Sequence, residues 1–173
     1  CDYNQTKAAT IAISKHYGPV YLRFGRPSVP NFTDPNLKFE IGKGIILNQG
    51  TDVTIIATGH LVWDALNAAE HLEEKGIYAE VINIHTIKPI DEKIILNSIK
   101  KTNAVVSAEE HNFHGGLGET VSRILSQNYP APQEFVATND TFGESGKPAE
   151  LMNKYGLNKE SIIDSCEKVI KRK

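Results

Sequence analysis

Cysteine is scarce in this chain, and that scarcity excludes two kinds of protein. The 173 residues include two cysteines, Cys1 and Cys166, with one methionine and one tryptophan. Two cysteines at opposite ends cannot build the disulfide framework of a small secreted domain, and they lack the close spacing of a zinc site. Cys166 falls on the apolar face of a predicted helix, so we interpret it as a buried thiol that packs as a small hydrophobic side chain.

Neither charge nor hydropathy is concentrated anywhere along the sequence. Nineteen Lys and Arg residues oppose 21 Asp and Glu residues, which gives a formal net charge of −2, and the only basic run is residues 171–173. This balance argues against a nucleic-acid partner, which needs a basic stripe. No run of about 18 apolar residues occurs, so we expect no membrane span. The start of the sequence shows no signal-peptide pattern.

Residues 1–26 predict one helix and one strand. Asp2 followed by Gln5 fits an N-capping box for a helix over residues 2–17. Residues 20–24 predict a strand. Two elements are too few to bury their own apolar faces, so we expect those faces to be partly bare. Because the sequence starts with cysteine, and its single methionine lies near the other end, we expect a processed chain or a piece of a longer protein.

Residues 27–50 predict a linker. Three prolines lie within residues 27–35, among asparagine and aspartate residues. Such a composition is typical of an extended connection between domains. Apolar residues around two glycines in the stretch 39–47 suggest a short hairpin at the end of this linker.

Residues 51–173 alternate strands with helices. Residues 53–57 are mostly apolar and β-branched, which indicates a strand covered on both faces. Helical spacing of apolar residues follows from residue 61, and Asp91 is placed to cap a second helix. The remaining expected strands are 78–84, 104–107 and 134–137, and the remaining expected helices are 115–127, 148–155 and 159–171. This alternation predicts an α/β fold with a mainly parallel sheet of about five strands and helices on both faces.

The most conspicuous cluster of reactive side chains is EEHNFHGGLGE, residues 109–119, between a predicted strand and helix. Glu109, His111 and His114 suggest metal ligands, but the glycines place both histidines in a loop rather than one helical turn apart. A dinucleotide fingerprint fails because Val121 stands where the third glycine is required. We favour a structural interpretation, in which the glycines allow a tight turn and close contact with a neighbouring chain or domain.

Arg23 and Arg26 are the other candidates for chemistry. They flank the end of a predicted strand, and Gly25 between them allows close approach to the backbone. An arginine fork suits bidentate contact with phosphate or carboxylate, and the alternative is a surface or inter-domain salt bridge. His60, at a predicted helix start, is better explained as a cap or surface contact. No Walker loop, nucleophile elbow or activated nucleophile is present, so the residues form no complete catalytic constellation.

Five motifs in register resemble the transketolase family. Residues 18–27, GPVYLRFGRP, resemble the last strand of its pyrimidine-binding domain and the loop that follows. Four further segments resemble its C-terminal domain, in the same order: 53–59, 85–91, 109–119 and 145–157. The synthase of 1-deoxyxylulose 5-phosphate and the β subunits of 2-oxo-acid dehydrogenases share this fold. The segment SGKPAEL, within the last of the four, makes transketolase the best match.

This resemblance implies a cytoplasmic, homodimeric transferase of the pentose phosphate pathway that moves a two-carbon ketol unit between sugar phosphates with thiamine diphosphate. In that family the diphosphate and Mg²⁺ are held by the N-terminal domain, and the activating glutamate belongs to the middle domain. We therefore expect no cofactor on this chain and no activity from it alone. By motif position, Arg26 matches the arginine that binds the substrate phosphate, whereas Arg23 matches no known ligand.

The expected organisation follows from the same resemblance. Residues 1–26 are the end of the pyrimidine-binding domain, residues 27–50 are a linker with a short hairpin, and residues 51–173 are the C-terminal domain, whose main role is dimer assembly with the N-terminal section. The parent is either one long chain or a split enzyme. Three alternatives stay open: a non-catalytic assembly or regulatory module, the equivalent part of the related synthase or dehydrogenase subunits, and an independent nucleotide-binding protein.

Overall fold

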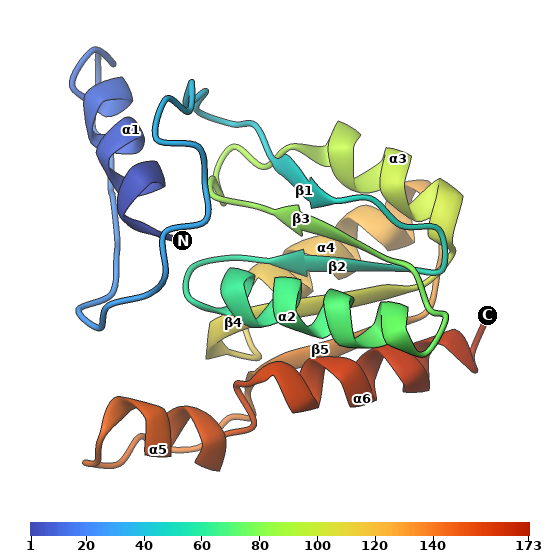
Figure 1. The fold of residues 1–173 in the computed structure, drawn as a ribbon. Helices are drawn as coiled ribbons and strands as arrows, with labels where there is room; N and C mark the ends of the chain where they lie inside the picture. Colours follow the sequence, from blue (N-terminus) through green and yellow to red (C-terminus); the bar gives the residue numbers. More distant parts are fainter.

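A five-stranded sheet with helices on both faces organises the computed structural model, which describes residues 1–173 (Figure 1). The strands lie in the order β1-β3-β2-β4-β5, with β1 antiparallel to β3 and all other pairs parallel. The strands are β1 (Ile45–Asn48), β2 (Val53–Ala57), β3 (Ala79–Asn83), β4 (Val105–Asn112) and β5 (Gln133–Thr138). The helices are α1 (Tyr3–Ile13), α2 (Leu61–Glu74), α3 (Glu92–Thr102), α4 (Leu117–Asn128), α5 (Pro148–Lys154) and α6 (Lys159–Ile170). The predicted fold class is confirmed.

The core consists of two apolar layers, one on each face of the sheet. Every residue of β2 and β3 is buried, as a strand covered on both faces requires. Ile55 packs in the layer under α2 and α6, whereas its neighbour Ile56 packs in the layer under α3 and α4. Cys166 lies fully buried in the first layer, and burial raises the pKa of its thiol. None of the helices combines the length and the apolar character that a bilayer crossing demands.

Two predicted helix starts are confirmed by their caps. Asp2 Oδ1 accepts a hydrogen bond from the Gln5 amide (2.9 Å), and Asp91 Oδ1 accepts one from the Ile94 amide (3.3 Å). The capping box at Asp2 is only half formed, because the Gln5 side chain accepts a hydrogen bond from Asn83 Nδ2 (3.2 Å) instead of returning to Asp2. Helix α1 ends at Ile13, four residues before the predicted end.

Two sequence predictions for the first fifty residues are wrong. Residues 20–24 form no strand, because no other strand of the chain lies beside them to complete a ladder of hydrogen bonds. Residues 39–47 form no hairpin, because only Ile45–Asn48 is a strand and its partner is β3, with Ile45 opposite Asn83. Strand β1 therefore pairs with β3 of the main sheet and not with a second strand of a hairpin.

The connections of the sheet reverse direction at the carboxyl ends of β2 and β4. From β2 the chain passes through α2 to β3 on one side, and it then returns through α3 to β4 on the other side of β2. Helices α2 and α4 consequently leave neighbouring strands toward opposite faces. Ligands of open α/β sheets bind at such a reversal point. In Figure 1, α1 and the blue segment that follows it lie along this edge of the sheet.

Candidate functional site

The end of β4 supplies the first part of the candidate site. Its pairing with β2 stops at Ala108, and residues 109–112 continue the strand beyond it. Glu109 is buried, and its carboxylate accepts hydrogen bonds from the amides of Leu117 (2.7 Å) and Gly118 (2.8 Å). A negative charge at this place also complements the dipole of α4. Glu109 therefore fixes the start of α4, a role that the sequence did not indicate.

The glycines of this turn make room inside the chain. A Cβ on Gly116 would overlap the Glu109 carboxylate, and a Cβ on Gly118 would overlap the Phe135 ring. Gly115 has a φ of +77°, which side chains disfavour. The tight turn expected from the sequence is confirmed, and the neighbours that require small residues include side chains of β4 and β5.

Glu110 points the other way and pairs with His60, the residue before α2. His60 Nδ1 lies 3.1 Å from Glu110 Oε2, and the His60 side chain is only 16% exposed. The hydrogen bond from His60 lowers the pKa of Glu110, and the nearby Arg23 and His111 act in the same direction against burial. His60 makes no side-chain cap on α2. Its partner lies fifty residues away, on the neighbouring strand.

His111 holds Arg23. The guanidinium of Arg23 donates to His111 Nε2, while Nδ1 of the same ring lies 3.8 Å from Glu109 Oε2. The prediction that His111 lies in a loop is wrong, because β4 extends to Asn112. His114 does lie in the turn, and its Nδ1 is 3.3 Å from Glu119 Oε1.

The side chains form no group of three or more His, Cys, Asp or Glu residues that could hold a metal ion. Glu109, His111 and His114 therefore do not form the metal site that they suggested in the sequence.

Arg26 differs from Arg23 in being unpaired. It is exposed at a bend in the chain. The arginine ion pairs of the structure belong to Arg123 and Arg172, so a salt bridge within the chain does not account for Arg26. Directly after it, Pro27 borders an open hollow of about 340 Å³ between this segment, α2 and α5. The hollow is lined by residues that include Val29, His60, Trp63, Asp64 and Met152. An unpaired guanidinium beside a hollow is available to bind an anion.

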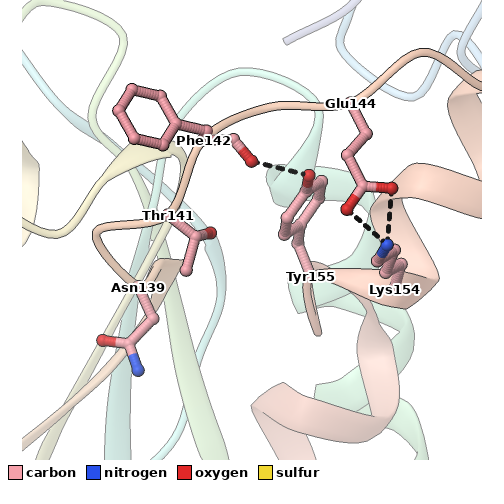
Figure 2. A pocket seen from close by; sticks show the side chains of 6 residues that line it. All are labelled: Asn139, Thr141, Phe142, Glu144, Lys154 and Tyr155. Atoms are coloured by element: carbon pink, nitrogen blue, oxygen red, sulfur yellow. Dashed lines mark hydrogen bonds and ion pairs between the residues drawn. The ribbon is translucent and has the colours of Figure 1, made fainter.

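A second hollow of about 340 Å³ lies where the chain passes from β5 to α5 (Figure 2). Its polar groups already bind one another: Lys154 Nζ donates to both oxygens of Glu144 at 2.6 Å, and the Tyr155 hydroxyl donates to the carbonyl oxygen of Phe142 at 3.1 Å. The Phe142 side chain points away from the hollow and is 98% exposed. These contacts hold the segment on α5 and leave no free charge in the hollow.

Comparison with known proteins decides the family. Residues 42–162 match the model of the transketolase C-terminal domain. The chain belongs to the transketolase family. It is 44% identical over 172 residues to the 6-deoxy-6-sulfo-D-fructose transketolase subunit SqwH of Clostridium sp. (strain MSTE9), covering 99% of this chain and 53% of that protein. It is 36% identical over 173 residues to an apulose-4-phosphate transketolase subunit of Phocaeicola vulgatus, covering 99% and 55%.

A solved structure agrees with these matches. The split-gene transketolase described as an inactive β4 tetramer superposes with a TM-score of 0.96 at 43% identity, covering 99% of this chain and 56% of that one. The chain thus spans about half the length of the transketolase relatives it matches, and these matches include the segment that carries both arginines.

Proposed function

We propose that the chain is the C-terminal part of a thiamine-diphosphate-dependent transketolase that transfers a two-carbon ketol unit between sugar phosphates. Its family and its coverage by two transketolase subunits support this role. The other part of the enzyme holds the cofactor, which supplies the carbanion chemistry when bound. This part contributes an assembly surface and a substrate contact, and it is inactive alone.

The partner of this chain is the N-terminal section of the same enzyme, and the complete enzyme is a homodimer of that assembly. In this proposal residues 1–26 end the pyrimidine-binding domain, residues 27–50 connect it, and residues 51–173 are the C-terminal domain. The first of these units exposes apolar side chains that an isolated surface rarely carries together. They are Tyr3 (67% exposed), Ile11 (49%), Tyr17 (101%), Val20 (44%), Tyr21 (86%) and Phe24 (67%). The N-terminal section covers them.

Arg26 binds the phosphate of the sugar. The observation that carries this role is its unpaired, exposed guanidinium at the carboxyl edge of the sheet, in the segment that Arg23 attaches to His111. A guanidinium donates two parallel hydrogen bonds to a phosphate and stays charged at every relevant pH. No acidic side chain of the chain competes for it.

Replacement of Arg26 in the complete enzyme tests this assignment. A charge-assisted hydrogen bond contributes about 1.5–3 kcal/mol, so R26A raises the KM for a sugar phosphate roughly 10- to 100-fold. The KM for the same ketose without phosphate stays constant, and R26K recovers part of the loss because it keeps the charge without the fork. Equal effects of R26A on both substrates would contradict the assignment.

A sulfonated sugar is a second candidate substrate. One similar protein is named for 6-deoxy-6-sulfo-D-fructose and the other for apulose 4-phosphate. Both substrates carry an anion, and an arginine fork accepts sulfonate oxygens as it does phosphate oxygens. Competition between the two sugars for the complete enzyme decides which anion the site prefers.

A further inference from the structure

Residues 17–30, which carry both arginines, have almost no attachments of their own. Their backbone makes no hydrogen bond with any other backbone group, and the Arg23–His111 pair is their single side-chain hydrogen bond. A loop without backbone hydrogen bonds is held only by what it touches. The position of Arg26 therefore depends on contacts with the two strand ends beneath it.

Gly25 rests directly on the imidazole of His60. A Cβ on this glycine would overlap both Cε1 and Nε2 of the ring, so the backbone lies against the ring edge. The ring cannot swing away freely, because Glu110 holds its Nδ1 at 3.1 Å and most of the side chain is buried. Arg26 follows Gly25 immediately and precedes Pro27, which restricts Arg26 to extended backbone.

We propose that His60 and Glu110 form a seat for Gly25 that positions Arg26 at the carboxyl edge of the sheet, with the Arg23–His111 pair as the second anchor of this loop. The proposal rests on the proposed function, because it concerns the arginine assigned to the substrate phosphate. His60 and Glu110 are positioning residues, since they act through the loop and touch no substrate. The carboxylate of Glu110 also attracts the nearby guanidinium of Arg23, which favours this loop position.

The seat is tested by filling it. In the complete enzyme, G25A pushes the loop off the His60 ring, so the KM for a sugar phosphate rises about tenfold while the kcat and KM for the unphosphorylated ketose stay constant. H60A removes the obstacle, so G25A/H60A recovers most of that loss. The matched control is G143A, because a Cβ on Gly143 meets no atom within 4 Å. A double variant as impaired as G25A would overturn the proposal.

A substrate-independent readout separates this proposal from the assignment of Arg26. Trypsin cleaves the Arg23–Phe24 bond but not the bond before Pro27, so its rate at Arg23 reports how firmly the loop is held. We expect G25A to speed cleavage of this chain severalfold and G25A/H60A to return it toward the original rate. If R26A leaves every KM unchanged but these cleavage rates hold, the substrate role fails and the seat stands. Equal cleavage rates in all variants would overturn the seat.

Discussion

Residues 51–173 and residues 1–44 differ in how far they bury their own apolar side chains. In the first region the strands and helices satisfy one another, and two apolar layers close the sheet on both faces. In the second, a single helix precedes a long segment without regular structure, and six large apolar side chains are exposed. Residues 51–173 therefore form their own hydrophobic core, whereas residues 1–44 are held by contacts with that core and with one another.

Few contacts hold residues 1–44 in place, and they involve particular side chains. The buried carboxylate of Asp2 accepts four hydrogen bonds, from the amides of Gln5, Phe32 and Thr33 and from the Thr33 hydroxyl. The Phe32 ring then stacks on Trp63 of α2, with the ring centroids 5.5 Å apart. Asp2 thereby attaches the start of α1 to Phe32 and Thr33. The seat under Gly25 holds the loop of residues 17–30, which lies between these two attachment points in the sequence.

The largest difference in stability between the two regions is expected at two isoleucines. Ile56 is fully buried in the sheet, whereas Ile11 on α1 is 49% exposed. I56A lowers the free energy of unfolding by about 2–5 kcal/mol, through lost burial and a cavity, whereas I11A changes it by less than about 0.5 kcal/mol. Urea denaturation of this chain measures both values. Similar losses for the two variants would show that α1 has a core of its own.

Glu109 extends the test to the start of α4. E109A leaves the amides of Leu117 and Gly118 buried without an acceptor, which costs about 1–3 kcal/mol of stability. E109Q keeps one acceptor oxygen and loses less. The control is E70A, on the exposed side of α2, which stays within about 0.5 kcal/mol. A loss for E109A no greater than that of E70A would mean that Glu109 is not the cap we describe.

Asp2 gives the smallest effect, confined to the attachment of the N-terminal region. Burial alone raises the pKa of Asp2, but its hydrogen bonds from Gln5, Thr33 and Phe32 outweigh burial and leave the pKa below its usual value. A depressed folded pKa means that the carboxylate stabilises the attachment above about pH 4, its ordinary unfolded pKa. That stabilisation is lost as the pH falls through the lowered pKa.

Trp63 reports this loss directly, because it is the only tryptophan and it stacks on Phe32. We expect its emission to change below pH 4 while the far-ultraviolet circular dichroism of the sheet stays constant. The D2N variant has no carboxylate at this position, so we expect the changed emission already at neutral pH. Emission that follows the circular dichroism at every pH would show that the two regions unfold together.

The sequence predicted what local patterns control. The apolar run of β2 and the cap at Asp91 depend on neighbouring residues, and both are confirmed. The strand expected at residues 20–24 depends on a partner that the chain does not supply. The end of β4 is polar, so no apolar pattern signalled that the strand continues to Asn112.

The site was less predictable than the fold. His60 and Glu110 lie fifty residues apart and meet because β2 and β4 are adjacent and parallel, with Ala57 opposite Ala108. Strand order and register together give that pairing, and neither is written in a local motif. The role of Arg26 came from motif position, and it stays a prediction.

We propose that this chain is one part of a transketolase whose cofactor site lies in the other part. Calorimetric titration with thiamine diphosphate and Mg²⁺, of this chain and then of the chain assembled with its N-terminal section, tests it most directly. We predict no binding heat for the chain alone and one cofactor bound per assembled active site. Stoichiometric binding to the chain alone would contradict the account, because a cofactor site would then exist among residues that we describe as structural.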